Sequence, residues 1–289
     1  MPSYPVKTGM LVLAACLALV ACARGGSASA DQLVDIGTHR LQLHCQGRGT
    51  PAVVIDAGIG DSLEKLGPLQ AGLARHTQVV AYNRAGYGKS GAGPLPRDCG
   101  REAEELKRLL ERAAVPAPYV LVGHSLGGLN MQAFAAMYPR EVAGMVLLDP
   151  PPVSFLLKQD HAELGAMAER MTAEWQAIAD AGGDQADFFR MIASEHREMF
   201  GASARRVASL ADFGDLLLVV VAAGRANPGF GEKAEEFQKF WIEQNRRLSA
   251  KSTRGRFILA EGASHYLYLD APDLVAKTIA AAVDEARAK

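Results

Sequence analysis

Short apolar, β-branched runs alternate with longer segments of helical pattern along most of this 289-residue chain. The runs that we expect to form buried strands are Ala52–Ile55, Gln78–Tyr82, Tyr119–Val122, Val142–Leu148, Asp215–Val221 and Arg256–Ala260. The segments of helical pattern are Arg101–Ala114, Leu126–Tyr138, Glu232–Leu248 and Pro272–Ala286. Strands that are apolar throughout, with helices between them, belong to a parallel sheet covered on both faces. The alternation therefore predicts an α/β fold.

Two segments depart from this alternation. Residues 32–46 alternate apolar and polar positions on either side of Gly37-Thr38, which is typical of a hairpin with one buried face. Residues 153–213 contain only helical or polar segments and separate two predicted strands of the same sheet. An all-helical insertion of this kind is better interpreted as a cap than as a separate domain. We therefore expect a core of residues 32–152 and 214–289, with a cap formed by residues 153–213.

The N-terminal segment is expected to be a targeting signal that does not belong to the fold. Lys7 precedes the apolar run Met10–Ala21, which is too short to span a bilayer comfortably. A charged start, a short apolar stretch and small residues at its end are typical of a secretory signal. The run closes with Leu19-Val20-Ala21-Cys22, which resembles the lipobox of bacterial lipoproteins. This resemblance implies that residues 1–22 form the signal, and that Cys22 receives the lipid and becomes the new N-terminus.

Ordinary signal cleavage after Ala28-Ser29-Ala30 is the alternative to lipid attachment. With a lipid anchor, residues 23–31 would serve as a flexible tether. The residue after the lipobox cysteine is Ala23 rather than Asp, which by the same resemblance favours the outer membrane. Without an anchor, we expect a periplasmic or secreted protein. The lipid anchor is the membrane contact that the sequence suggests.

The net charge and the histidine and cysteine residues bear on possible partners, metal sites and disulfides. The formal net charge is −1, so nucleic acid is not an expected partner. The histidines and cysteines form no C-x-x-C or H-x-x-x-H pair, which argues against a zinc site. After export, Cys45 and Cys99 remain, and an oxidising compartment permits them to form a disulfide. Two independent buried or reduced thiols are the alternative.

The segment Gly123-His124-Ser125-Leu126-Gly127 lies between a predicted strand and a predicted helix. This setting distinguishes a nucleophile elbow, in which a sharp turn presents the serine hydroxyl to a base, from a chance G-x-S-x-G. Glycines are expected on either side because a Cβ there would collide with the neighbouring strand and helix, and Gly128 extends this small surface. A glycine-rich turn with a surface serine is the alternative. We therefore expect Ser125 to be a nucleophile.

With these motifs in this order, the whole chain after the signal resembles the α/β-hydrolase family. Residues 83–90 (NRAGYGKS) are similar to the family's D-R-x-G-x-G-x-S turn, with Asn83 in place of the usual Asp. This turn is structural in the family, so we expect no catalytic role for it. The resemblance implies an α/β-hydrolase fold, with a mostly parallel central sheet, helices on both faces and a helical cap. Ser125 occupies the position where haloalkane dehalogenases and epoxide hydrolases carry a carboxylate, which argues against those relatives.

His265 is the expected general base for Ser125. It follows the last predicted strand and precedes the last predicted helix, and the chain order of serine and then histidine matches the family. The remaining histidines fit poorly because most lie in the N-terminal hairpin, before an early strand or in the cap. His124 adjoins the nucleophile, but on a tight turn its side chain is expected to point elsewhere. A surface histidine in a Gly/Ser-rich loop is the alternative for His265.

Asp149 is the expected acid of the triad. The family usually carries this acid after the strand at 215–221, but here the loop 222–229 (AAGRANPG) contains no carboxylate. Some relatives place the acid one strand earlier, and Asp149 stands at the end of that strand. A carboxylate there can fix the tautomer of the imidazole and stabilise the imidazolium. The alternatives are an Asp149 that only caps a turn beside three prolines, and Glu232, water or a neutral Asn227 as the partner of the histidine.

Two backbone N–H groups are expected to form an oxyanion hole, as the family resemblance implies. One belongs to Leu126, the residue after the nucleophile. The other follows the strand Ala52–Ile55, where many relatives have His-Gly-x and this chain has residues 56–62 (DAGIGDS). Aligning Ala57-Gly58 with His-Gly makes Ile59 the second donor. A plain glycine turn is the alternative.

The resemblance implies a serine hydrolase that cleaves a carboxylic ester, or a related acyl bond, of a small-molecule substrate. The reaction passes through an acyl-enzyme and requires no metal or organic cofactor. Apolar cap residues suggest an apolar acyl or alcohol pocket; they are Phe155, Leu156, Leu157, Met167, Met171, Trp175, Phe188, Phe189, Met191 and Phe200. The alternatives are C–C or lactone hydrolysis or perhydrolysis by the same residues, and a non-catalytic binding protein, which the missing acid in the usual loop would favour.

Overall fold

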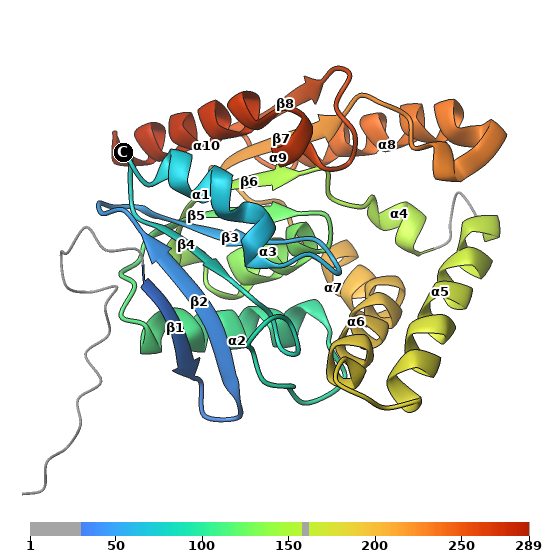
Figure 1. The fold of residues 1–289 in the computed structure, drawn as a ribbon. Helices are drawn as coiled ribbons and strands as arrows, with labels where there is room; N and C mark the ends of the chain where they lie inside the picture. The colour runs from blue at the N-terminus through green and yellow to red at the C-terminus, as the bar shows by residue number, and fades with distance from the viewer. Residues whose placement is uncertain (1–29, 158–161, 289) are drawn as a thin grey trace, which may run out of the picture.

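An eight-stranded sheet forms the centre of the computed structural model, which describes residues 30–157 and 162–288 (Figure 1). In spatial order the strands are β1 (Ala30–Asp35), β2 (Arg40–Gln46), β4 (Val79–Tyr82), β3 (Ala52–Asp56), β5 (Tyr119–His124), β6 (Val142–Leu148), β7 (Leu217–Ala223) and β8 (Gly255–Ala260). The pairs β1–β2 and β2–β4 are antiparallel, and the remaining neighbours are parallel. The expected α/β fold with a mostly parallel sheet is confirmed.

Helices cover both faces of this sheet. On one face lie α1 (Gly67–Leu73), α9 (Leu267–Asp270) and α10 (Pro272–Arg287), and on the other lie α2 (Cys99–Arg112), α3 (Leu126–Met137) and α8 (Ala234–Ser249). Along β3, Val53 and Ile55 pack in the hydrophobic core on the face covered by α1 and α10. Ala52 and Val54 pack in the core on the opposite face, which α2, α3 and α8 cover. Successive strand residues point to opposite faces, so a strand buried on both faces is apolar at every position. This explains the continuous apolar runs in the sequence.

Between β6 and β7 all the regular elements of the described residues are helices, joined by loops. They are α4 (Val153–Leu156), α5 (Ala162–Asp180), α6 (Ala186–Glu198), the π-helical turn η3 (Met199–Ser203) and α7 (Ala204–Ala208). Figure 1 shows α5 and α6 beyond the end of the sheet toward which β6 and β8 point. We refer to residues 153–213 as the helical insertion. It therefore lies next to the carboxyl ends of the parallel strands.

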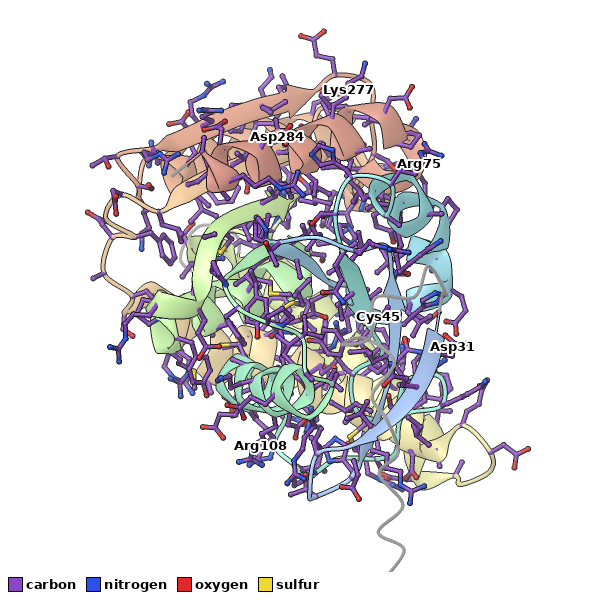
Figure 2. The ribbon with its side chains drawn as sticks, turned by 90° about the vertical axis from the view of Figure 1, so that its left-hand side faces the viewer. Asp31, Cys45, Arg75, Arg108, Lys277 and Asp284 are labelled. Carbon is purple, nitrogen blue, oxygen red and sulfur yellow. The ribbon has the colours of Figure 1, made fainter. Side chains whose placement is uncertain are left out.

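Figure 2 shows the end of the molecule opposite to the helical insertion, with Asp31 on β1 and Cys45 on β2. Cys45 is disulfide-bonded, whereas Cys99 is a free, buried thiol. The Cys45–Cys99 disulfide that the sequence suggested is therefore wrong. The backbone N–H of Cys99 donates to the Ser203 hydroxyl at 2.9 Å, and its thiol lies 3.9 Å from Ser203 O, so this cysteine faces the helical insertion.

The expected signal, the lipidation site Cys22 and the tether as far as residue 29 lie outside the described residues. The remainder of the expected tether does not behave as one, because Ala30 and Asp31 pair with Cys45 and His44 in the β1–β2 ladder. The ordered sheet thus begins earlier than residue 32. Within residues 30–157 and 162–288, no helix has the length and apolar character needed to cross a bilayer.

Candidate active site

Ser125 occupies a strained turn between β5 and α3. Its backbone has φ 50° and ψ −120°, a conformation that residues with a Cβ rarely adopt. Such strain costs of order 1–3 kcal/mol and is typical of functional sites. The residue is half-buried. The geometry is that of a nucleophile elbow.

The elbow is possible because the glycines around it leave room for close backbone packing. A Cβ on Gly123 would lie 2.5 Å from Gly127 O, and a Cβ on Gly127 would lie 2.4 Å from Asp56 O at the end of β3. On Gly128, a Cβ would lie 2.8 Å from the side chain of Pro150. All three separations are shorter than real Cβ contacts allow. The elbow therefore packs directly against the loop that follows β3.

An acid–base pair lies at the same edge of the sheet. Nδ1 of His265, in the loop between β8 and α9, lies 2.6 Å from Oδ2 of Asp149, which directly follows β6. Asp149 is buried, and the imidazole of His265 is about one third exposed, at 32%. A short contact between a buried carboxylate and Nδ1 leaves Nε2 as the free nitrogen of the ring. The histidine is therefore oriented as a general base requires.

The second oxygen of Asp149 is also engaged. Oδ1 accepts a hydrogen bond from the indole Nε1 of Trp241 on α8 at 2.9 Å, and another from the backbone N–H of Ala223 at 2.9 Å. Ala223 ends β7, where the family usually carries its acid. In this chain that position supplies a backbone donor to a carboxylate on the neighbouring strand. Trp241 was not foreseen, since nothing in its local sequence distinguishes it from a core residue.

In the described part of the chain, neither alternative side-chain partner forms a hydrogen bond or ion pair with His265. Glu232 is exposed on the turn η4 (Pro228–Lys233), which precedes α8. Asn227 is exposed as well, and its Oδ1 accepts a hydrogen bond from the backbone N–H of Gly229 at 2.9 Å. Among the described residues, Asp149 is thus the carboxylate that His265 contacts.

Backbone hydrogen bonds hold Ser125 and Asp149 on adjacent strand ends. The N–H of Ser125 donates to Leu148 O at 3.0 Å, and the N–H of Asp149 donates to Val221 O at 2.7 Å. The Ser125 hydroxyl itself makes no hydrogen bond with a residue that the structure describes. In free enzymes the contact between nucleophile and base is often long and tightens when substrate binds. The strand order therefore brings serine, acid and histidine to one edge of the sheet.

His124, which was expected to point away from the site, instead supports the histidine loop. Its Nε2 lies 2.8 Å from His265 O, and the two imidazole rings are 4.7 Å apart. Burial, with a smaller contribution from His265, lowers the pKa of His124 to about 3, so the ring is neutral at pH 7. A neutral ring whose Nε2 faces a carbonyl donates its proton there. His124 thus ties the loop that carries His265 to the elbow that carries Ser125.

The loop after β3 carries one expected oxyanion donor. Its glycine Gly58 packs against His124, since a Cβ there would lie 2.8 Å from Nδ1 of that ring. Neither the N–H of Ile59 nor that of Leu126 donates to an acceptor in the described part of the chain. Leu126 opens α3, where backbone N–H groups have no partner within the helix. The two amides are available to a ligand oxygen.

An aromatic cluster joins the helical insertion to the strand ends. Phe155 on α4 lies 5.7 Å from Phe200 in η3, 5.3 Å from Phe237 on α8 and 5.8 Å from Trp241, measured between ring centroids. Trp241 lies 6.4 Å from the ring of His265. The surroundings of the acid–base pair are therefore apolar on the side of the insertion. The described residues contain no group of three or more His, Cys, Asp or Glu side chains arranged to hold a metal ion.

Comparisons with known proteins agree with this architecture. Residues 53–278 match the alpha/beta hydrolase family. The Bacillus subtilis (strain 168) protein YqjL is 28% identical over 232 residues, which cover 80% of this chain and 83% of YqjL. The enol-lactonase from Burkholderia xenovorans LB400 has a TM-score of 0.62 at 19% identity, covering 88% of this chain and 100% of that one. A thermophilic esterase from Thermogutta terrifontis has a TM-score of 0.60 at 17% identity, with 90% and 99% covered. At such identities the two solved structures show a shared fold.

Proposed function

Because this chain belongs to the alpha/beta hydrolase family, we propose that it is a serine hydrolase that cleaves carboxylic esters of small, apolar substrates. The observation that carries the proposal is the 2.6 Å contact between His265 Nδ1 and the buried Asp149, next to a serine in strained elbow geometry. A serine becomes a useful nucleophile at neutral pH when an oriented base accepts its proton.

In the first half of the reaction, Nε2 of His265 takes the hydroxyl proton as Ser125 Oγ attacks the ester carbonyl. The carbonyl oxygen gains the negative charge, which the N–H groups of Ile59 and Leu126 stabilise. Asp149 stabilises the imidazolium by its negative charge without accepting the proton. When the tetrahedral intermediate collapses, the imidazolium donates its proton to the leaving alkoxide. The products are an alcohol and an acyl group bound to the serine.

In the second half, His265 acts again as a base, now toward a water molecule. The water attacks the acyl carbonyl, and the same two amides stabilise the second oxyanion. Collapse breaks the bond to Ser125 Oγ, which regains its proton from the imidazolium. The carboxylic acid leaves and the free enzyme is restored. Each proton is accounted for by the serine, the histidine and the water.

Apolar side chains of the insertion, with the half-buried Phe200 packed on Phe155, lie beside the strand ends and support a preference for apolar acyl or alcohol groups, because burying apolar surface is favourable. Lactone opening, C–C hydrolysis and perhydrolysis would use the same residues. One named neighbour is an enol-lactonase and another an esterase. A substrate panel must therefore include p-nitrophenyl esters of increasing chain length and simple lactones.

A biotinylated fluorophosphonate probe tests the proposal directly, since it phosphonylates an activated serine. We expect covalent labelling of the wild-type protein, none of Ser125→Ala, and a loss of ester turnover of about 10³- to 10⁴-fold in Asp149→Asn. The control Glu232→Gln should behave as wild type. Well-folded protein that is neither labelled nor active would favour the non-catalytic alternative. Near-normal turnover in Asp149→Asn would refute the assignment of the acid.

We also propose export, with a lipid anchor on Cys22, on the basis of the N-terminal sequence. Metabolic labelling with a palmitate analogue should mark the wild-type protein and leave Cys22→Ala unmarked. A lipid thioether and a disulfide at one sulfur exclude each other. Mapping the cysteine bonded to Cys45 is therefore a second test. A disulfide between Cys22 and Cys45 in protein isolated from cells would refute the anchor.

A further inference from the structure

A buried ionic network connects the helical insertion to the loop after β3. Arg84, just beyond β4, is 2% exposed, and Glu195 on α6 is 1% exposed. Nε of Arg84 donates to Oε1 of Glu195 at 2.8 Å, and Nη1 donates to Oδ1 of Asp56 at 2.6 Å. Asp56 Oδ2 in turn accepts a hydrogen bond from Asn130 at 2.8 Å. Glu195 is the member of this network that comes from the insertion.

The same guanidinium holds two successive carbonyls of the loop. Nη1 of Arg84 donates to Ala57 O at 2.7 Å, and Nη2 donates to Gly58 O at 3.0 Å. A trans peptide is planar, so its C=O and the following N–H point in opposite directions. Anchoring Gly58 O toward Arg84 therefore sets the direction of the Ile59 N–H, away from the arginine.

The loop is held on the other side of Ile59 as well. The hydroxyl of Tyr87 accepts a hydrogen bond from the N–H of Gly60 at 3.1 Å and donates to Oε2 of Glu195 at 2.5 Å. Both routes, through Arg84 and through Tyr87, lead to the carboxylate of Glu195. Ile59 is thus flanked by two backbone contacts whose side chains, Arg84 and Tyr87, both bind one carboxylate of the helical insertion.

We propose that Glu195 is a positioning residue that, through Arg84 and Tyr87, orients the Ile59 N–H as an oxyanion donor. This inference rests on the proposed serine hydrolase function. It gives the turn at residues 83–90 a role in catalysis beyond the structural one expected from the sequence. It also makes the insertion part of the catalytic apparatus, because a displacement of α6 would remove the carboxylate that Arg84 and Tyr87 share and leave Arg84 held by Asp56 alone among its carboxylate partners in the described residues.

Two variants test whether Glu195 orients the Ile59 N–H or only attaches the helical insertion to the core. Tyr87→Phe removes a single hydroxyl and leaves every charge in place. It loses the hold on Gly60 and the 3.2 Å hydrogen bond from Arg84 Nη2, but keeps the ion pair of Arg84 with Glu195. Glu195→Gln removes the charge that both routes share. The matched control is Thr172→Val, which breaks the 2.7 Å contact between Thr172 and His196 inside the insertion without touching the loop.

The measurements are kcat and KM for a p-nitrophenyl ester, inhibition by a trifluoromethyl ketone whose adduct carries an oxyanion, and amide hydrogen exchange of residues 56–62. Loss of one oxyanion donor typically lowers kcat about 10²- to 10³-fold. A donor that is misdirected but still present should lower kcat by less. We expect kcat to fall about 10- to 100-fold in both variants, with KM within about twofold and inhibition weakened in parallel. Exchange should rise in the loop, and Thr172→Val should match the wild type in all three.

The inference would be overturned if Tyr87→Phe and Glu195→Gln left kcat and the amide hydrogen exchange of residues 56–62 unchanged. It would also be overturned if Thr172→Val lowered kcat as much as these two variants do. If Glu195→Gln does not fold, Tyr87→Phe decides the matter alone. A wild-type protein that shows neither turnover nor fluorophosphonate labelling would refute the proposed function instead. In that case faster exchange of the loop in Tyr87→Phe would still support the link between insertion and loop, and unchanged exchange would overturn it.

Discussion

Replacing Trp241 by phenylalanine removes one hydrogen-bond donor from Asp149 while keeping an aromatic ring in place. The indole Nε1 donates to Oδ1 at 2.9 Å, and the ring packs 5.5 Å from Phe237 and 5.8 Å from Phe155. After the change, the backbone N–H of Ala223 is the hydrogen-bond donor that remains to Oδ1 among the described residues. The substitution therefore tests what a second donor does for the proposed triad acid.

The expected magnitude follows from the burial of this carboxylate. Asp149 is 3% exposed, and a hydrogen bond to a charged group contributes about 1.5–3 kcal/mol. Loss of the bond should lower the free energy of unfolding by about that amount. A carboxylate that rotates toward its remaining donor also misorients His265, so part of the same energy appears in catalysis. Since about 1.4 kcal/mol corresponds to a factor of ten, we expect kcat/KM to fall about 10-fold, with an upper limit near 100-fold.

Steady-state hydrolysis of a p-nitrophenyl ester and urea denaturation measure the two effects. The control is Phe230→Leu, which trims the same aromatic cluster at a ring 4.2 Å from Phe237 and does not touch Asp149. It should lose stability but keep kcat/KM within about twofold. If Trp241→Phe loses stability and keeps the wild-type kcat/KM, the indole serves the fold alone. The reasoning that assigns it a role in orienting the triad would then be refuted.

Three further predictions concern packing, pH and thiol reactivity. Gly127→Ala places a Cβ 2.4 Å from backbone Asp56 O and should destabilise the fold by about 1–3 kcal/mol or more, whereas Gly72→Ala, with open space around it, should be neutral or stabilising in a thermal melt. Burial lowers the pKa of His196 to about 4. Unfolded histidine binds its proton near pH 6.5, so His196 by itself should lower the unfolding free energy by about 3 kcal/mol between pH 6.5 and 4, and the total decrease should be smaller by about that amount in His196→Gln. Burial raises the pKa of Cys99 to about 11, so iodoacetamide should alkylate it only after denaturation; rapid reaction of the native thiol would contradict the burial.

The pattern of apolar residues was sufficient to locate most of the elements. The strand expected at Val142–Leu148 coincides with β6, and the one expected at Ala52–Ile55 forms all but the last residue of β3. Strand and helix patterns are local, because they depend on which neighbours along the chain share a face. The setting of Ser125 between a strand and a helix is local in the same sense. Glycines two residues away on either side leave the space that the turn at Ser125 needs.

Partners far apart in the chain could not be obtained from local pattern. The pairing of Asp149 with His265 across 116 residues was expected from the family resemblance alone. The contacts of Asp149 with Trp241 across 92 residues and of Arg84 with Glu195 across 111 were not expected. The predicted disulfide between Cys45 and Cys99 was wrong because positions along the chain do not give the distance between two residues in space.

The sequence by itself thus determined the class of fold, the elbow at Ser125 and the set of polar residues at the strand ends. Only the tertiary structure decided that Ala223 stands where the family usually carries its acid, and that the backbone N–H of Ala223 donates a hydrogen bond to Asp149. The physical reason is the order of the sheet, in which β6, β7 and β8 lie side by side and bring their carboxyl ends together. Local periodicity specifies each strand, and burial of the whole sheet specifies which strands become neighbours.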